Sequence, residues 1–360
     1  MKSIDSNIRK ASTIPSAFYT ESSFFESSKG DIFDKTWHWI GKKKEILPQG
    51  VNSYPFFLYE KFLAEPLVLI EENEDLRCLS NVCTHRAFLL CHHPGQLRNI
   101  TCAYHGRRFG LDGQMQHMPE FKEAEDFPRP CDHLATLPIK LWQDFLFTAI
   151  NPNFDFEIIA NKLNERIGFL DMANYRYAPE SDKIYHVNAH WALYVDNFLE
   201  GFHIPFVHDT LGGMIDYGSY VTECYDYLNL QIGYSKGDTP YFDLPEGHMD
   251  YGKKVTAYYY WIFPNLMLNV YPWGMQVNVV VPISLQSTKV YFYHYIADED
   301  LWKSMEGEHV AEKTQREDEW VVEGVQKGLK SRFYDTGRFS PAREQGVHHF
   351  HSLIAQFMEG

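Results

Sequence analysis

The sequence of 360 residues predicts a protein of the α+β class, with a small all-β domain followed by a larger domain in which helices flank an antiparallel sheet. The chain is long enough to build two hydrophobic cores, and from about Asp34 to Asn151 it shows short strands separated by turns. Beyond Asn151, helical apolar spacing alternates with long strand-like runs, a mixture that favours helices packed on an antiparallel sheet. We therefore expect a first segment at 1–37 that packs on the larger domain, the small domain at 38–151 and the larger domain at 152–360.

Short apolar runs bounded by turn residues define the small domain. Residues 66–70, PLVLI, and residues 77–82, RCLSNV, indicate two strands that flank the charged turn EENED. Residues 111–114, LDGQ, contain the Asp-Gly pair that is typical of a tight turn. We expect a small antiparallel β-structure that presents two short groups of Cys and His residues between its strands.

Longer periodic segments define the larger domain. Residues 190–203 have helical apolar spacing, the acidic segment from Glu306 to Tyr334 is predicted to form one long amphipathic helix, and residues 350–357 are predicted to form a last helix. Strand-like runs occupy residues 255–263, 266–271, 275–281 and 289–296.

Composition and charge limit the classes of partner. No apolar run is long enough to cross a bilayer, and the first twenty residues lack the apolar core of a signal peptide, so we expect a cytoplasmic protein. In that reducing compartment the six cysteines need not form disulfides and are available as ligands. The net charge of −15 argues against nucleic acid or an anionic membrane as partner. Small molecules and other proteins remain.

Two pairs of metal-binding residue types lie in the small domain. Cys83 and His85 form a C-x-H pair, and Cys102 and His105 form a C-x-x-H pair, with sixteen residues between the two pairs. Two Cys and two His can hold zinc in a tetrahedral site. They can also hold a [2Fe–2S] cluster in which one iron has two Cys ligands and the other has two His ligands. Each pair supplies one thiol and one imidazole, which favours the cluster, although the zinc site remains an alternative.

A second group of possible ligands lies in the larger domain, within YVDNFLEGFHIPFVHD. Glu200 and His203 are three residues apart, so we expect both on one face of a helix. His203 and His208 are five residues apart, which on an ideal helix leaves them roughly 140° out of register. Pro205 disfavours helical geometry before it and clashes with the preceding turn. We therefore predict a kink at Pro205 that brings His208 back toward His203.

A carboxylate on the acidic helix completes this second group. With about 100° per residue, Asp318 falls near the centre of an apolar face, whereas Glu317 and Glu319 fall to either side. This apolar face is made of Val321, Val322, Val325, Leu329 and Phe333. A carboxylate on a buried face requires a cation, and a metal ion is favoured over a salt bridge. With His203 and His208, Asp318 would give the two-histidine, one-carboxylate triad of non-haem Fe(II) oxygenases.

The first motif, with its surroundings CTHR and CAYHG, resembles the C-x-H-x(15–17)-C-x-x-H motif of the Rieske non-haem iron oxygenases, in their catalytic alpha subunit. Respiratory-chain Rieske proteins have two further cysteines that form a disulfide, and here Phe88 and Tyr104 occupy those positions. One departure from the pattern is Arg107, where many oxygenases carry Trp.

The second group resembles the same alpha subunits. In that family a bridging carboxylate precedes the first iron histidine by three positions, which matches Glu200, and the pattern E-D-x-x-x-x-E-x-V-Q-x-G-L matches the chain from Glu317 to Leu329 and supports Asp318 as ligand. Most relatives have Asp at the bridge. The Glu at this position and the segment VDNFLEGFH are similar to the choline, glycine-betaine and carnitine branch, which oxidises quaternary amines. The resemblance also implies a helix-grip-like catalytic domain.

The resemblance implies a mechanism and a set of cofactors. Electrons from NAD(P)H would enter through a separate flavin and iron–sulfur reductase, pass to the [2Fe–2S] cluster and then reach a mononuclear Fe(II) that reacts with O2. Glu200 would connect the two centres across neighbouring subunits of a homotrimer. The substrate would be a small organic molecule, hydroxylated or N-demethylated at a trimethylammonium group.

Aromatic residues on the predicted strands suggest how such a substrate binds. Tyr260, Trp261 and Tyr271 are our candidates for an aromatic cage around the ammonium group, although strand alternation lets only about half of such residues face the cavity. Aromatic-ring hydroxylation is the enzymatic alternative. A Rieske-type electron-transfer protein without oxygenase activity and a zinc-stabilised binding module are the alternatives of other classes.

Overall fold

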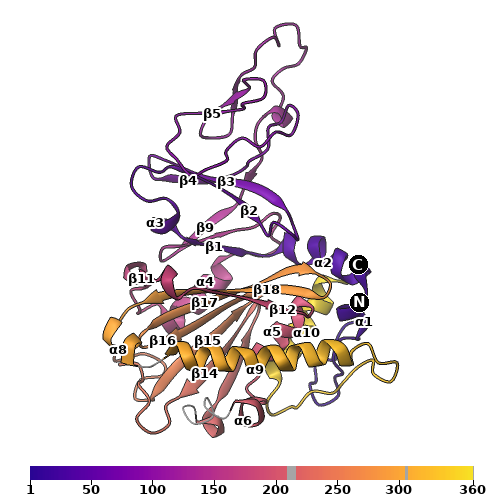
Figure 1. Ribbon diagram of the computed structural model, residues 1–360, viewed down its shortest axis with the longest axis vertical. Coiled ribbons are helices and arrows are strands. Elements are labelled where there is room, and N and C mark those ends of the chain that lie inside the picture. Colours follow the sequence, from indigo (N-terminus) through magenta and orange to yellow (C-terminus); the bar gives the residue numbers. More distant parts are fainter. Residues whose placement is uncertain (209–215, 305–306, 360) are drawn as a thin grey trace. The chain divides into compact units, whose positions relative to one another are not determined.

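The computed structural model describes residues 1–208, 216–304 and 307–359 (Figure 1). Its contacts divide the chain into two compact units. One unit is residues 34–153, and the other combines residues 1–33 with residues 154–360.

The smaller unit is built from short antiparallel strands. A four-stranded sheet has the order β2–β3–β4–β8, a three-stranded sheet the order β1–β10–β9 and another the order β5–β6–β7. Their bounds are β1 (His38–Lys42), β2 (Ser53–Leu58), β3 (Glu65–Glu72), β4 (Asp75–Ser80), β5 (Ile100–Thr101), β6 (Arg108–Phe109), β7 (Met115–His117), β8 (Thr136–Leu137), β9 (Ile139–Trp142) and β10 (Phe145–Thr148). The short helix α3 (Lys43–Ile46) and the 3₁₀ turn η2 (Pro130–Asp132) lie between strands.

The predicted strands around the charged turn are confirmed as β3 and β4. Asn73 and Glu74 at the tip have φ angles of 51° and 68°, the left-handed conformation that a two-residue hairpin turn needs. Inner residues of both strands, among them Val68, Ile70 and Leu79, form one core cluster with Cys83 and Cys102. The two thiols of the first motif therefore belong to the hydrophobic core of this unit.

The larger unit is built on an antiparallel sheet of eight described strands in the order β11–β18–β17–β16–β15–β14–β13, with β12 also paired to β18. The strands predicted in this domain are confirmed. Their bounds are β11 (Arg176–Tyr177), β12 (Lys183–Val187), β13 (Val221–Tyr225), β14 (Leu228–Tyr234), β15 (Val255–Ile262), β16 (Leu266–Tyr271), β17 (Gly274–Ser284) and β18 (Ser287–Ile296).

Helices cover this sheet, and α9 runs across one face of it (Figure 1). The helix α5 contacts both α9 and β17, and α10 contacts β13. The helices of this unit are α1 (Ala17–Thr20), α2 (Ser22–Asp31), α4 (Glu157–Ile167), α5 (Trp191–Phe198), α6 (Ile204–Val207), α8 (Glu299–Ser304), α9 (Gly307–Gly328) and α10 (Gln345–Phe357). The 3₁₀ turns η1 (Phe33–Lys35), η3 (Met172–Asn174), η4 (Pro179–Ser181) and η5 (Tyr217–Ser219) complete the described elements. None of the described helices is long and apolar enough to span a membrane.

The acidic helix α9 differs from its prediction at its C-terminal end. It ends at Gly328, whereas the prediction extended it to Tyr334; Glu306, the predicted first residue, lies outside the described part of the chain. Phe333, which we assigned to the apolar face, is 93% exposed, and Val325 is also exposed. Gly at a helix end is a common terminator, and the apolar spacing alone did not show it. Val322 is buried as predicted.

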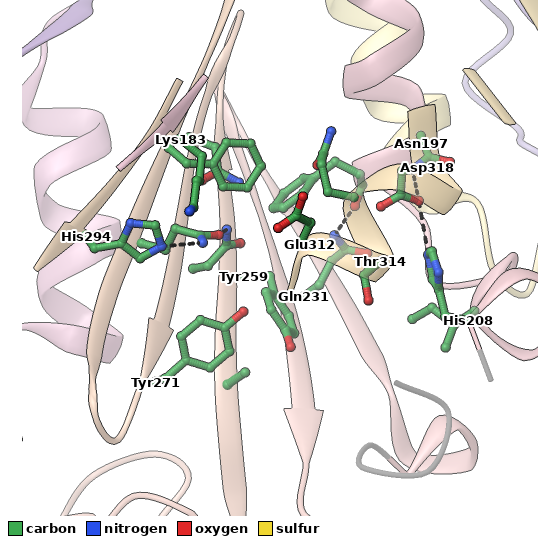
Figure 2. A pocket seen from close by; sticks show the side chains of 18 of the residues that line it. Lys183, Asn197, His208, Gln231, Tyr259, Tyr271, His294, Glu312, Thr314 and Asp318 are labelled. Carbon is green, nitrogen blue, oxygen red and sulfur yellow. Dashed lines mark hydrogen bonds and ion pairs between the residues drawn. The ribbon is translucent and has the colours of Figure 1, made fainter. Parts of the chain in front are cut away.

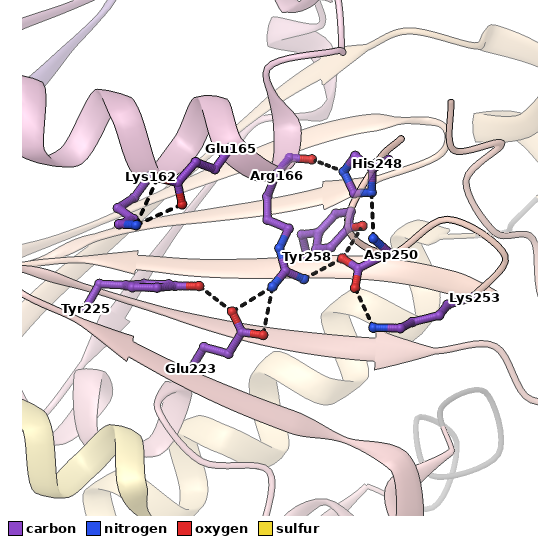
Figure 3. Close-up of polar contacts among 9 residues, drawn as sticks. All are labelled: Lys162, Glu165, Arg166, Glu223, Tyr225, His248, Asp250, Lys253 and Tyr258. Atoms are coloured by element: carbon purple, nitrogen blue, oxygen red, sulfur yellow. Dashed lines mark hydrogen bonds and ion pairs between the residues drawn. The ribbon is translucent and has the colours of Figure 1, made fainter. Parts of the chain in front are cut away.

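A buried ionic network ties α4 to the sheet (Figure 3). The guanidinium of Arg166 on α4 pairs with Asp250 and with both carboxylate oxygens of Glu223 on β13, the latter at 2.8 Å each. Asp250 also accepts hydrogen bonds from Lys253 (2.8 Å) and from the hydroxyl of Tyr258 on β15 (3.1 Å). These contacts fix the segment before β15 to the face of the sheet that α4 covers.

Candidate metal centres and active site

The four Cys and His residues of the first motif lie in two adjacent loops of the smaller unit. Cys83 and Cys102 are each 2% exposed, and their thiols are within hydrogen-bonding reach of each other. The rings of His85 and His105 lie edge to face, with their centroids 4.8 Å apart. The four side chains therefore form two pairs, one of thiols inside and one of imidazoles outside.

Both cysteines begin the same kind of turn. The N–H of Ala87 donates to the C=O of Cys83 (2.9 Å), and the N–H of Gly106 donates to the C=O of Cys102 (3.0 Å). Ala87 and Gly106, four residues after their cysteines, both have left-handed φ angles, 54° and 71°. The two loops are thus equivalent at their cysteines, although the histidine follows two residues later in one loop and three residues later in the other.

This arrangement fits a two-iron cluster better than a single zinc ion. Among the described residues, the one group of three or more Cys, His or acidic side chains whose ligand atoms all lie within 4.8 Å of one another is found in the larger unit. The ligand atoms of a tetrahedral ion must meet around one point, whereas in the first motif thiol lies against thiol and imidazole against imidazole. A [2Fe–2S] cluster requires a pair of thiolates and a separate pair of imidazoles.

The surroundings of Cys83 also suit a cluster ligand. Burial raises the pKa of its thiol, whereas the backbone N–H groups of His85 and Arg86, which point at the sulfur, lower it. Hydrogen bonds of this kind to cluster sulfurs tune Rieske centres. Arg107, the departure from the family pattern, is buried and pairs with Asp132 at 2.8 Å.

The converging group of the larger unit consists of His203, His208 and Asp318. The Nε2 atoms of both histidines lie close to the same carboxylate oxygen. Oδ1 of Asp318 is 3.5 Å from Nε2 of His203 and 3.0 Å from Nε2 of His208. Asn197 on α5 donates to this oxygen at 2.7 Å (Figure 2). Two imidazole nitrogens and one carboxylate oxygen are the donor set of a mononuclear non-haem iron site.

The local fold that produces this group differs from our prediction. The helix α5 ends at Phe198, so Glu200 and His203 lie in a turn and not on one helical face, and Pro205 stands in the first turn of the separate helix α6. Glu200 accepts the backbone N–H groups of Phe202 and His203 (3.0 Å to the latter). In an unbroken helix these N–H groups would donate to the carbonyls of residues 198 and 199.

The carbonyl of Phe198 that this break releases is satisfied from the sheet, because Gln231 on β14 donates to it at 2.7 Å. Pro at the start of α6 is favourable because its missing N–H is not needed there. Side chains therefore replace the helical hydrogen bonds on both sides of the break. Pro205 lies inside α6, His203 precedes this short helix with helical angles, and the chain leaves helical geometry at His208 (φ −116°, ψ 82°).

A carboxylate contacts the Nδ1 atom of each of the two histidines. Nδ1 of His203 lies 2.6 Å from Oε1 of Glu200, and Nδ1 of His208 lies 2.8 Å from Oε2 of Glu317. A carboxylate that accepts the Nδ1 proton keeps Nε2 free as a ligand and fixes the ring orientation. Burial lowers the pKa of His208, but its contacts with Asp318 and Glu317 raise it overall. Sequence analysis missed the contact of Glu317 because α9 spacing placed this residue beside the central face.

A cavity of about 270 Å³ adjoins the triad, and the three side chains line it. Figure 2 shows His208 and Asp318 at one side of it and His294 and Lys183 at the other. Most of its floor is the face of the sheet covered by α5 and α9. The cavity is a size that holds a small molecule.

Comparisons with known proteins agree with this geometry. Residues 174–360 match the ring hydroxylating alpha subunit (catalytic domain), which is more than half of the chain, and residues 36–136 match the Rieske [2Fe-2S] domain. The chain belongs to the ring-hydroxylating alpha subunits.

Relatives of known activity cover nearly the whole alpha subunit. The carnitine monooxygenase oxygenase subunit of Escherichia coli K12 is 28% identical over 370 residues, which is 97% of this chain and 95% of that protein. The chloroplastic choline monooxygenase of Beta vulgaris is 27% identical and covers 97% of this chain and 78% of that protein. The structure of a quaternary ammonium Rieske monooxygenase, studied for carnitine oxidation by gut microbiota and inter-subunit electron transfer, superimposes with a TM-score of 0.78 at 26% identity over 98% of this chain and 97% of that one.

The alpha subunit is thus an oxidoreductase that carries a Rieske [2Fe-2S] domain and a catalytic domain for mononuclear iron. The alternatives of an electron carrier or of a zinc-stabilised module are not supported. The thiol and imidazole pairs of the smaller unit fit the cluster, and the triad fits the mononuclear iron.

Of the three aromatic residues that we expected around the substrate, only Tyr271 lines the cavity of the alpha subunit. Tyr260 faces the opposite side of β15, where its pKa responds to burial and to Arg166. Trp261 lies on the cavity side but is covered by Phe350 of α10, with ring centroids 5.1 Å apart. Tyr259 lines the cavity, and sequence analysis did not select it.

Proposed function

We propose that this alpha subunit hydroxylates a carbon attached to the nitrogen of a trimethylammonium compound, using O2 and electrons from a separate NAD(P)H-dependent reductase. The observation that carries the proposal is a group of three tyrosines on the cavity wall, Tyr220, Tyr259 and Tyr271. The rings of Tyr259 and Tyr271 lie edge to face at 5.8 Å. Aromatic faces attract quaternary ammonium groups, which have no hydrogen-bond donors. The relatives named for carnitine and choline support the same class of substrate.

Tyr220, at one end of the tyrosine group, lies beside the proposed metal ligands. Tyr220 packs close to Gly201, which directly follows Glu200 in the turn before α6. Burial raises the pKa of Tyr220, and the nearby Tyr259 and Glu200 raise it further. Tyr259 is also buried, which raises its pKa to about 12, so both rings stay neutral at physiological pH. A trimethylammonium group held there places its methyl groups next to the triad.

The chain's own residues prepare this site. When bound, the cluster relays electrons one at a time and the mononuclear iron activates dioxygen. His203, His208 and Asp318 would hold the iron, while Glu200 and Glu317 hold the Nδ1 protons of the two histidines.

The overall reaction on an N-methyl group balances as a monooxygenation. One oxygen atom of O2 inserts into a C–H bond of the methyl group, and the reductase's two electrons, with two protons, reduce the other oxygen atom to water. The product is a carbinolamine, in which a hydroxymethyl group remains on the quaternary nitrogen. Cleavage of its C–N bond then releases formaldehyde, and the hydroxyl proton stays with the nitrogen as a protonated tertiary amine.

Electron supply requires partners. We propose that the alpha subunit forms a homotrimer in which Glu200 also contacts a Rieske histidine of the neighbouring subunit. The inter-subunit electron transfer named for the related quaternary ammonium enzyme supports this arrangement. A flavin and iron–sulfur reductase would supply the electrons from NAD(P)H, and the proposed location of both proteins is the cytoplasm.

The test is turnover by the reconstituted holoenzyme with a surrogate reductase and NADH. We expect trimethylammonium compounds to stimulate O2 consumption and to yield an oxidised product, detected by mass spectrometry, in stoichiometric amounts. Naphthalene serves as the comparison substrate. Oxidation of naphthalene without oxidation of any trimethylammonium compound would show that the alpha subunit is a hydroxylase of aromatic rings.

A further inference from the structure

One row of directly opposed residues crosses the cavity floor. Gln231 on β14 pairs with Tyr259 on β15, Tyr259 with Asn269 on β16, Asn269 with Gln276 on β17, and Gln276 with His294 on β18. All five side chains line the cavity. The row begins at α5, beside the turn that carries Glu200, and ends at the side of the cavity away from the triad (Figure 2).

The far half of this row is polar and internally hydrogen-bonded. Asn269 donates to Gln276 at 3.2 Å, and Nε2 of Gln276 lies 2.9 Å from Nε2 of His294. The amide nitrogen of Gln276 faces Nε2 of His294, which can accept its hydrogen bond. These residues are therefore held in place by one another and form a rigid polar floor.

Two further side chains at this side lack partners. Asn278, next to Gln276 on the same face of β17, is 4% exposed, and its buried side-chain oxygen has no hydrogen-bond partner among the described residues. Lys183 on β12 lies in the same cross-strand row, because Lys183 and Asn278 both pair with Phe292 on β18. Lys183 makes no ion pair with any described residue, although it lines the cavity and points into it (Figure 2). A buried amide and a cation without partners, aimed into one cavity, indicate a missing ligand.

Charge is distributed unevenly over the lining. Lys183 is the only Lys or Arg among the described lining residues, whereas Glu200 and Asp318 lie at the side of the triad. Glu312, the remaining acidic lining residue, lies 3.8 Å from Arg316. Within the described part of the chain, the cavity therefore has an acidic side at the triad and a side with one free cation, and aromatic residues line both sides.

We propose that Lys183 and Asn278 form an anion subsite that binds a carboxylate of the substrate, so that the substrate is a zwitterion with a trimethylammonium group at one end and a carboxylate at the other. This inference rests on the proposed function, because the tyrosine group fixes which end of the substrate lies near the triad. The ammonium of Lys183 would donate to the carboxylate, and the Asn278 amide would turn its NH2 group toward it. Trimethylammonium compounds without a carboxylate, such as choline, would bind weakly.

The test compares two probes that differ in one charge, 4-(trimethylammonio)butanoate and its methyl ester. Their dissociation constants are measured by calorimetry on the anaerobic holoenzyme, without turnover. We expect the acid to bind at least about tenfold more tightly than the ester, as a charge-assisted hydrogen bond allows. Lys183→Met should abolish this preference by weakening the acid alone, and Lys183→Arg should restore part of it. Lys289→Met on the opposite face of β18 is the matched control and should retain the preference.

The outcomes separate this inference from the proposed function. Equal affinities of the wild-type protein for acid and ester, or a preference that survives Lys183→Met, would overturn the anion subsite and leave the trimethylammonium assignment in place. Failure of both probes to bind, together with oxidation of an arene by the same preparation, would overturn both. The comparison of acid with ester in the wild-type protein needs no variant and is independent of whether Lys183→Met folds.

Discussion

The Nε2 atom of His208 lies 3.0 Å from Oδ1 of Asp318, although 110 residues separate them in the sequence. This contact joins the end of α6 to the middle of α9. Since Nε2 of His203 lies near the same oxygen, the three side chains form a site that neither the segment around α6 nor α9 can form alone. Replacing any one of the three should therefore affect iron and leave the cluster of the smaller unit intact.

Asp318→Asn should remove the mononuclear iron. The amide is neutral and a poor ligand for Fe(II), so iron content should fall from about three to about two per chain while the spectrum of the [2Fe–2S] cluster is unchanged. Iron quantitation with ultraviolet–visible spectroscopy measures this. Glu319→Gln is the control and should keep all of the iron. Glu319 is a neighbouring carboxylate on α9 that pairs with Arg316. Full iron content in Asp318→Asn would exclude Asp318 as ligand.

Glu317→Gln should weaken iron binding without abolishing it. Its carboxylate lies 2.8 Å from Nδ1 of His208, and loss of such a partner typically reduces metal affinity by about 10–100-fold. Anaerobic titration of the iron-free triad with Fe(II) measures the dissociation constant. Lys313→Met, which removes the cation 3.6 Å from Glu317 and leaves the His208 contact, is the control and should have a much smaller effect. An unchanged dissociation constant in Glu317→Gln would limit Glu317 to a structural role.

The strands and the ligand types could be predicted from the sequence because both leave local signals. Runs rich in β-branched and aromatic residues mark the strands of the larger unit, and the paired Cys and His residues mark the loops of the smaller one. The break after Phe198 left no such signal. Apolar spacing continues through Gly201, and the break depends on hydrogen bonds from Glu200 and from Gln231, which lies on a strand far along the chain.

The aromatic lining shows a second limit of sequence analysis. In an exposed sheet, alternation of polar and apolar residues reveals which face is inside. On β15 both faces are covered, so Tyr258, Tyr259, Tyr260 and Trp261 are all aromatic residues and give no alternation. For this reason we selected Tyr260 and Trp261, which do not line the cavity, and did not select Tyr259, which does.

The network around Asp250 predicts a pH-dependent contribution to stability. Burial raises the pKa of this carboxyl, but hydrogen bonds and charges of Lys253, Arg166 and Tyr258 outweigh it and hold the pKa below its ordinary value of 3.8. A lowered folded-state pKa means that the contribution is present above the unfolded value and is lost as the pH falls through the folded one. Asp250→Asn should destabilise the protein by about 3 kcal/mol at neutral pH, as removal of one partner of a buried ion pair does.

Urea unfolding of the wild type and Asp250→Asn from neutral pH down to pH values below 3.8 measures this difference. We expect the wild-type advantage to shrink as the pH falls. Glu165→Gln, which removes an exposed partner of Lys162 on the same helix, is the control and should change stability little. A difference that is constant over the whole pH range would show that Asp250 acts by packing and not by charge.

Glu200→Gln should separate metal binding from turnover. Glu200 holds Nδ1 of His203 at 2.6 Å and accepts backbone N–H groups of the turn, and Gln keeps its shape but has only one oxygen. We expect a weaker affinity for iron, as in Glu317→Gln, but with Fe(II) in excess both metal centres should remain occupied and the reductase should reduce the cluster at the wild-type rate. Product formation should fall by about 10–100-fold, because the histidine is no longer oriented and the path between centres loses its carboxylate. Glu312→Gln, which removes the same charge from the cavity lining without contacting either histidine, should retain activity. Stopped-flow reduction of the cluster, iron quantitation and product analysis measure the three quantities, and loss of either metal in Glu200→Gln would contradict the role of a bridge.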